Sequence, residues 1–395
     1  MKYQSSYPPS PETRRGAGGE VNLTKVTLSL LSTLLTTQFA FAQTPAVSQL
    51  QPAPIMSRWE KQVTPENAWR EYPRPQLVRK QWQNLNGLWE YAITPKTAPK
   101  PTQFSGQILV PFAVESTLSK VTKSLLRDQR LWYRRTISLP QDWSGQRVIL
   151  HFGAVDYECN LWVNDGLVGS HTGGSDAFSF DITDFLKDGA NELVLGVTDP
   201  TSTGEQPRGK QLLNPNGIWY TPVSGIWQTV WMEPVPKQTY IEEVRLTPEL
   251  DSGRVRVEVL LDKPANNFTT AVRVTALDGN QTVASTLVRA GRAAYLSIKS
   301  PKLWSPDKPF LYDYRVDLVT VTDPFGDTPR NRRPRQDEAL RTAYANATVT
   351  GNPLDVVTGY FAIRKISVGP GPVANQPVLL LNNKFVFQNG PLDQG

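Results

Sequence analysis

The sequence has almost no cysteine and little histidine. Cys159 is the only cysteine in 395 residues, so the chain cannot form an internal disulfide. It falls on the apolar side of an alternating stretch, where a cysteine acts as a small buried hydrophobe rather than a nucleophile. The two histidines, His151 and His171, have no cysteine or acidic cluster at metal-ligand spacing. The sequence therefore predicts no metal site and no cofactor.

The sequence also lacks a strong excess of either positive or negative charge. The formal net charge is +6, and most of this excess is spread along the chain. The densest run, at 330–335, has four arginines and is followed at once by Asp337 and Glu338. A nucleic-acid surface needs a larger region of one sign with aromatic platforms beside it. We therefore interpret the run as a solvated loop and expect no nucleic-acid partner.

Only one long apolar run is present, and it lies near the N-terminus. Lys25 precedes an apolar stretch at 26–35, and Ala-Phe-Ala stands at 40–42. This pattern predicts a secretory signal peptide within residues 1–42, cleaved after Ala42. The rival interpretation, a membrane anchor, is disfavoured because the run is short and rich in Thr and Ser. Export without disulfides favours a bacterial periplasmic or extracellular protein with no membrane span after cleavage.

Proline (33 residues) and glycine (27 residues) are plentiful and follow no repeat, which is typical of a turn-rich, all-β chain. After a polar leader at 43–71, apolar residues begin to alternate, as at Val148, Leu150 and Phe152. Asn-Asp-Gly at 164–166 predicts a tight hairpin turn, because such turns require positive φ values. We predict a β-sandwich over 72–236.

A second set of short strands follows a Pro-containing boundary. Val255, Val257 and Val259 alternate with charged residues, and similar runs recur over about 130 residues. This predicts an immunoglobulin-like β-sandwich over 237–367. The polar stretch 322–350 is expected to be a loop. The last residues, 368–395, contain a predicted hairpin with Asn-Asn at 382–383 as its turn.

Seven segments, in order, resemble glycoside hydrolase family 2, the β-galactosidase, β-glucuronidase and β-mannosidase group. They are Leu-Asn-Gly-Leu-Trp at 85–89, Val-Pro-Phe at 110–112 with Glu-Ser at 115–116, Trp-Tyr-Arg-Arg at 132–135, Leu-Trp-Val-Asn-Asp-Gly at 161–166 with Phe-Ser-Phe-Asp-Ile-Thr at 178–183, Gly-Ile-Trp at 217–219 with Ser-Gly-Ile-Trp at 224–227, Leu-Trp-Ser-Pro at 303–306 with Pro-Phe-Leu-Tyr at 309–312, and Gly-Tyr-Phe-Ala-Ile-Arg-Lys at 359–365.

The resemblance implies a jelly-roll sugar-binding domain over 72–236, then the immunoglobulin-like domain. In the family a TIM barrel follows and holds two catalytic glutamates in the retaining arrangement. Residues 368–395 are similar to the hairpin and first strand that enter this barrel. A barrel needs about 250 further residues, so no catalytic residue is assigned here. The expected partners are a carbohydrate and the chain's own missing barrel.

The resemblance also implies a loop at the mouth of the sugar site, at 205–220. Its hydrogen-bonding residues are candidates for contact with sugar hydroxyls, and Trp219 is a candidate platform for a pyranose ring. We name as substrate-binding candidates Arg208, Gln211, Asn214, Asn216, Trp219 and, beside His171, Asp176. Plain loop structure is the alternative for each of them. Trp162, Trp227 and Trp231 are assigned to the core rather than to sugar platforms.

Catalysis within the chain itself has weak support. Four carboxylates are candidates by residue type only, and we interpret them as turn caps and solvated charges: Glu205, Asp176, Asp181 and Asp184. No Gly-x-Ser-x-Gly turn supports a serine nucleophile. The sequence thus predicts the non-catalytic N-terminal part of an exported retaining glycosidase acting on β-linked sugars, inactive alone. The alternatives are a stand-alone carbohydrate-binding or adhesion protein and a scaffold without ligand.

Overall fold

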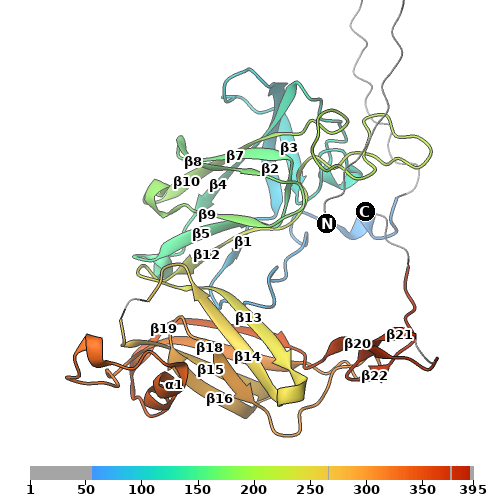
Figure 1. Cartoon of the computed structure of the whole chain (residues 1–395). Coiled ribbons are helices and arrows are strands. Elements are labelled where there is room, and N and C mark those ends of the chain that lie inside the picture. The colour runs from blue at the N-terminus through green and yellow to red at the C-terminus, as the bar shows by residue number, and fades with distance from the viewer. Residues whose placement is uncertain (1–55, 266, 374–375, 392–395) are drawn as a thin grey trace, which may run out of the picture. The chain divides into compact units, whose positions relative to one another are not determined.

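The computed structural model describes residues 56–265, 267–373 and 376–391, and it confirms the all-β class (Figure 1). The predicted signal peptide lies outside these residues. In the described part of the leader, one short 3-10 helix, η1 (Glu60–Gln62), precedes the first strand. No helix among the described residues combines the length and the apolar character needed to cross a membrane.

The first sandwich packs a six-stranded antiparallel sheet against a four-stranded one. The larger sheet has the order β3 (Gly106–Val110), β2 (Gly87–Pro95), β4 (Gln129–Ser138), β10 (Ala190–Thr198), β7 (Glu158–Val163) and β8 (Gly166–Thr172). The smaller sheet has the order β1 (Gln83–Asn84), β12 (Val230–Val235), β5 (Arg147–Phe152) and β9 (Phe178–Asp181). A separate pair joins β6 (Val155–Asp156) to β11 (Gly225–Ile226). Three 3-10 helices lie between these strands: η2 (Thr117–Ser119), η3 (Gln141–Trp143) and η4 (Thr183–Phe185).

The alternating sequence pattern explains the register of this sandwich. Leu161 of β7 pairs with Leu195 of β10, and both are buried in the core between the sheets. Asn164 and Asp165 have φ values of 48° and 70°, which confirms the tight turn between β7 and β8. Phe152 of β5 is fully buried on the facing sheet. The two layers thus hold the connecting loops at fixed positions around a rigid core.

The second sandwich also has two antiparallel layers. One has the order β13 (Ile241–Glu249), β14 (Arg254–Leu261) and β17 (Ala294–Ser297), with η5 (Leu250–Ser252) at a turn. The other has the order β16 (Gln281–Arg289), β15 (Thr270–Asp278), β18 (Tyr312–Val321) and β19 (Val349–Phe361). Val257, Val274 and Val316 are fully buried between the layers, as the alternation predicted.

The prediction of a loop over 322–350 is wrong. The stretch contains η6 (Arg330–Arg332) and the α-helix α1 (Asp337–Ala345), and β19 begins at Val349. Leu340 and Tyr344 are spaced four residues apart on one helix face and pack on Ala271 and Val319 of the sheet. The sequence did not reveal this packing, because Leu340 and Tyr344 are the only buried residues among the described side chains of this mostly polar helix.

The C-terminal hairpin is confirmed and is part of a three-stranded sheet. Its order is β20 (Ile366–Pro370), β21 (Pro377–Leu381) and β22 (Lys384–Phe385). Asn382 and Asn383 form the turn with φ values of 52° and 63°. Asn is one of the few residues other than glycine that tolerates this conformation.

Candidate functional site

Three carboxyl groups from distant parts of the first sandwich meet beneath the loop that joins β10 to β11. Glu115 follows β3, Asp156 ends β6, and Asp199 follows β10. We call these residues the carboxylate cluster. Glu115 and Asp199 are 5% and 3% exposed, and Asp156 is half-buried. Buried carboxyl groups require hydrogen-bond partners. Ser224 and Thr201 supply partners to Glu115 and Asp199.

Ser224 joins two members of the cluster. Its backbone N–H donates to Oε2 of Glu115 at 2.9 Å, and its hydroxyl donates to Oδ2 of Asp199 at 2.6 Å. Asp199 also accepts from the backbone N–H and the hydroxyl of Thr201, at 2.7 and 3.0 Å. These bonds fix both ends of the 199–224 loop at the cluster.

Burial shifts the proton affinity of the cluster. Loss of solvent raises the pKa of Glu115 to about 7, and the charge of Asp199 adds to this rise. Burial and Asp199 likewise raise the pKa of Asp156 to about 7, against the lowering effect of a hydrogen bond from Gln211. Oε1 of Glu115 is buried and has no hydrogen-bond partner in the described part of the chain. At neutral pH the cluster therefore holds protons as well as negative charge.

Tyr133 closes the cluster from the core side. It is fully buried on β4, and its hydroxyl accepts from the backbone N–H of Ile226 at 3.1 Å. Gly225 lies against the Tyr133 hydroxyl, and a side chain at this position would collide with it. Burial raises the pKa of Tyr133, so the hydroxyl stays neutral. Packing of Gly225 against Tyr133 thus closes the core side of the cluster.

Of the predicted sugar-contact residues in the loop, Gln211 contacts this cluster, whereas Trp219 bonds within the loop. Gln211 is half-buried, and its Oε1 accepts from the backbone N–H of Val223 at 2.6 Å while its side chain bonds to Asp156. The side-chain amide of Gln211 is therefore already hydrogen-bonded to Val223 and Asp156. Trp219 is half-buried, and its backbone N–H donates to the carbonyl of Asn216 at 3.0 Å.

The other loop candidates differ in exposure. Asn214 and Asn216 are exposed, and Nδ2 of Asn216 donates to the carbonyl of Asn214 at 3.3 Å. Arg208 is half-buried earlier in the loop. Ile218 and Tyr220 beside them are 67% and 68% exposed. The loop thus presents amide groups and apolar surface together, a combination that suits the hydroxyls and the ring face of a sugar.

The Gly-Gly turn brings Asp176 to the edge of the same region. Gly174 packs against the Asp156 side chain, and its carbonyl accepts from Nε1 of Trp227 at 2.7 Å. The exposed carboxylate of Asp176 lies 3.3 Å from Nε2 of His171, whose ring stacks on Phe178. Asp176 is thus near the cluster, with its charge directed to the histidine.

The tryptophans assigned to the core differ in burial. Trp231 is 5% exposed and stacks on His151, whereas Trp162 and Trp227 are half-buried. Trp162 lies against Trp132 on the outer face of the six-stranded sheet. All three have ring or hydrogen-bond contacts within the fold.

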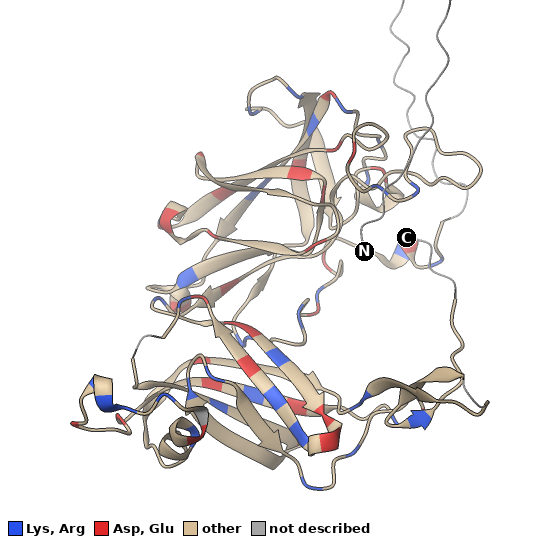
Figure 2. Ribbon diagram, in the orientation of Figure 1, with Lys and Arg blue, Asp and Glu red and all other residues tan. Residues whose placement is uncertain are grey.

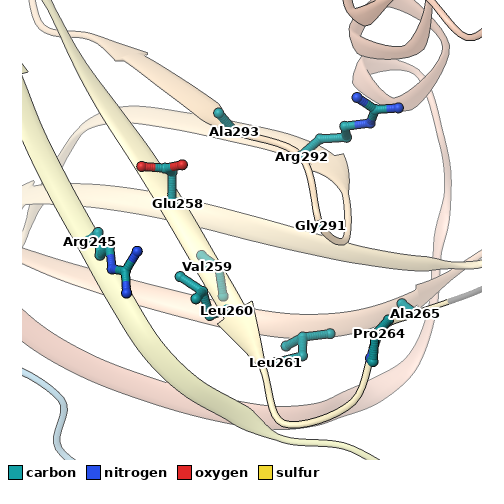
Figure 3. Close-up of a pocket in the computed structure, with 10 residues that line it drawn as sticks. All are labelled: Arg245, Glu258, Val259, Leu260, Leu261, Pro264, Ala265, Gly291, Arg292 and Ala293. Carbon is teal, nitrogen blue, oxygen red and sulfur yellow. The ribbon is translucent and has the colours of Figure 1, made fainter.

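A further cavity lies away from the carboxylate cluster. The cavity of about 260 Å³ on the second sandwich is lined by β14 and by the turn after β16 (Figure 3). Arg245 pairs with Glu243 at 2.7 Å, Glu258 pairs with Arg256 at 2.7 Å, and Arg292 extends away from the cavity. Within the described ranges, no three His, Cys, Asp or Glu side chains are arranged to hold a metal ion.

Sequence reasoning missed all three residues of the carboxylate cluster. Glu115 belongs to the Glu-Ser segment at 115–116 that resembles the family, but the sequence suggested no role for its side chain. Asp156 and Asp199 directly follow buried strand residues, and this position was the one available signal. The four carboxylates considered instead are exposed, and Asp181 bonds to Thr183 and pairs with Arg147 at 2.8 Å.

Comparisons with known proteins agree with the sequence resemblance. Residues 82–232 match the family model "Glycosyl hydrolases family 2, sugar binding domain", and residues 239–326 match "Glycosyl hydrolases family 2". A putative β-glucuronidase of Formosa agariphila is 29% identical over 209 residues, covering 51% of this chain and 24% of the relative. A β-glucuronidase of Paenibacillus borealis is 25% identical over 269 residues, covering 63% and 44%.

The fold is also found in a solved glycosidase. A β-glucuronidase from Ruminococcus gnavus in complex with C6-substituted uronic isofagomine has a TM-score of 0.58 and 20% sequence identity. The match covers 81% of this chain and 51% of that chain. The present chain thus spans about a quarter to a half of the length of these relatives.

Proposed function

This chain belongs to glycoside hydrolase family 2, and we propose that it is the non-catalytic N-terminal part of an exported retaining hydrolase of β-linked sugars. The observation that carries the proposal is the match of residues 82–232 to the family's sugar-binding domain. Relatives bear the names β-glucuronidase and β-galactosidase, so β-glucuronides and β-galactosides are both candidate substrates.

In this proposal the 199–224 loop forms one wall of the sugar site. Asn214 and Asn216 donate and accept hydrogen bonds with sugar hydroxyls, and Trp219 packs on a ring face. The support is their position on a loop whose two ends are hydrogen-bonded to the carboxylate cluster. Such anchoring keeps the loop preorganised, which lowers the entropic cost of binding. Gln211, Arg208 and Asp176 act at its base.

The chemical step belongs to another part of the enzyme in this proposal. A retaining glycosidase needs two accessible carboxyl groups about 5 Å apart across the scissile bond. Glu115 and Asp199 are buried and accept hydrogen bonds from Ser224, so a glycosidic oxygen has no route to them. This burial supports a binding role for the domain and an inactive isolated chain.

The C-terminal sheet supports attachment to a further domain. Ile366, Val368 and Leu379 share one face of this sheet, where they are 66%, 69% and 50% exposed, and Phe387 beyond it is 79% exposed. Contiguous exposed apolar residues are typical of an interaction surface. We propose that the missing barrel covers this face. The stand-alone carbohydrate-binding protein, by contrast, has no partner for it.

Sequencing the gene downstream of the codon for Gly395 tests this proposal against the stand-alone alternative. We expect the reading frame to continue for about 250 residues with alternating strands and helices. A stop codon directly after Gly395, in an intact natural gene, would contradict the proposal. Export is tested separately, by N-terminal sequencing of the secreted protein, which should begin at Gln43.

A further inference from the structure

The loop that carries η6 concentrates positive charge. Residues 328–336 include four arginines and no carboxylate, and they lie beyond residue 326, where the family match ends. This segment is therefore a feature of this chain that the matched part of the family does not explain. Figure 2 shows its basic residues around η6 on the second sandwich.

One of the four arginines holds the loop in place. Nε of Arg333 donates to the carbonyl of Thr328 at 2.8 Å, and Nη2 donates to the carbonyl of Gly326 at 3.1 Å. Nη1 pairs with Asp323 at 2.8 Å, and the guanidinium lies 4.8 Å from the ring centre of Phe268. These contacts tie the loop to the segment that precedes it and to Phe268.

The other three arginines are left for solvent or a ligand. Arg330, Arg332 and Arg335 are exposed, and no carboxylate in the described part of the chain pairs with them. Acidic residues flank the loop in sequence, with Asp327 before it and Asp337 and Glu338 after it. Three exposed guanidinium groups within six residues give the loop a local positive charge that attracts a polyanion.

We propose that Arg330, Arg332 and Arg335 bind an acidic polysaccharide through its uronate carboxylates. This inference rests on the proposed function, because it takes a glycan as the partner of the chain. The planar guanidinium group matches a carboxylate with two parallel hydrogen bonds. A single exposed pair contributes little, but a polymer with repeated carboxylates engages several arginines at once. The loop has no exposed aromatic side chain on which nucleic-acid bases would stack.

Affinity electrophoresis of the full chain in gels containing hyaluronan tests the proposal. Wild type should be retarded, and the triple variant R330Q/R332Q/R335Q should bind about tenfold more weakly. Gels with neutral dextran should retard neither protein. Raising the salt concentration should weaken the retardation by hyaluronan, because exposed charges are screened.

A control variant removes the same charge elsewhere. K80Q/K123Q/K187Q replaces three exposed lysines on other parts of the chain, and it should keep most of the affinity. If both variants lost hyaluronan affinity equally, net charge alone would explain the binding, and the proposal would be overturned. Unchanged binding by the arginine variant would do the same, as would tighter binding of an oligodeoxynucleotide of equal charge. Thermal unfolding confirms that both variants are folded.

Failure of this inference and failure of the proposed function can be told apart. Binding or hydrolysis of a small β-glycoside does not require the arginine loop, so a negative hyaluronan result leaves the glycosidase proposal standing. If instead the gene ended at Gly395 and hyaluronan still bound through these arginines, the glycosidase proposal would fail and the polysaccharide site would remain.

Discussion

Arg79 and Asp355 form a buried ion pair between residues 276 positions apart in the chain, with Nη2 and Oδ2 separated by 2.7 Å. Arg79 also reaches Oε1 of Glu233 at 3.2 Å and the carbonyl of Ile241 at 2.6 Å. Although burial alone would raise it, hydrogen bonding from His151 and the charges of the nearby arginines lower the pKa of Glu233 to about 2. One guanidinium group thus links strands of both sandwiches.

Replacing Arg79 with Met should destabilise the fold by about 3–5 kcal/mol, because buried Asp355 would lose its counter-charge and Glu233 would keep only Arg74 of its two arginine partners. Urea unfolding at pH 7 measures the change. R245M is the matched control, since Arg245 and Glu243 form an exposed pair that contributes about 0–1 kcal/mol. Similar midpoints for both variants would show that the buried pair has no special importance.

The raised pKa of Glu115 predicts a pH-dependent stability. Between the unfolded pKa of about 4.3 and the folded value of about 7, the native state holds a proton that the unfolded state releases. This contribution to stability is full below pH 4 and is lost as the pH rises through 7. Its size is on the order of 3 kcal/mol.

The variant E115Q should remove this contribution, so the wild type should lose stability relative to E115Q from pH 5 to pH 8. Comparing the two proteins isolates Glu115, because Asp156 and His151 titrate in both. Urea midpoints at several pH values give the slopes. Parallel curves for the two proteins would refute the assignment, and D184N, at an exposed carboxylate, should follow wild type.

Two glycines with positive φ allow a controlled test of packing at the cluster. Gly225 (φ 82°) lies against the Tyr133 hydroxyl, whereas a Cβ at Gly217 (φ 56°) would meet no atom within 4 Å. G217A should therefore cost only the backbone strain of about 1 kcal/mol. G225A should cost at least about 1 kcal/mol more, from the added clash. Equal unfolding free energies would contradict the packing described here.

Much of the fold could be predicted from local patterns. The period-two alternation identified β5, β7 and β14, and Asn-Asp-Gly at 164–166 identified the β7–β8 turn, because both signals depend on neighbouring residues only. Helix α1 could not be recognised in this way. Its two buried residues, Leu340 and Tyr344, stand in a polar segment, and the sheet surface that they cover is distant in sequence.

The carboxylate cluster was unpredictable for a related reason. Glu115, Asp156 and Asp199 come from three separate strand ends, and only the pairing of β6 with β11 and the position of Ser224 bring them together. No local pattern marks such a site. The loop residues were easier to nominate, since polar residues near aromatics in a long loop are visible in the sequence.

The sugar-contact proposal predicts a binding defect for the loop variants. In the enzyme that contains this chain and its catalytic domain, N216A should lower kcat/KM about 2–10-fold through loss of one hydrogen bond. W219A should lower it further, because a ring contact is lost. N331A, at an exposed asparagine on the η6 loop, is the control and should match wild type. Wild-type kinetics for both loop variants would remove this loop from the sugar site.

The most direct test of the account is an activity assay of purified residues 43–395 with aryl β-glucuronides, β-galactosides and β-mannosides. The central claim is that this part of the enzyme binds sugar and performs no chemistry. We predict a correctly folded protein that releases no aglycone above the uncatalysed rate. Steady turnover of any of these substrates by the chain alone would contradict the claim.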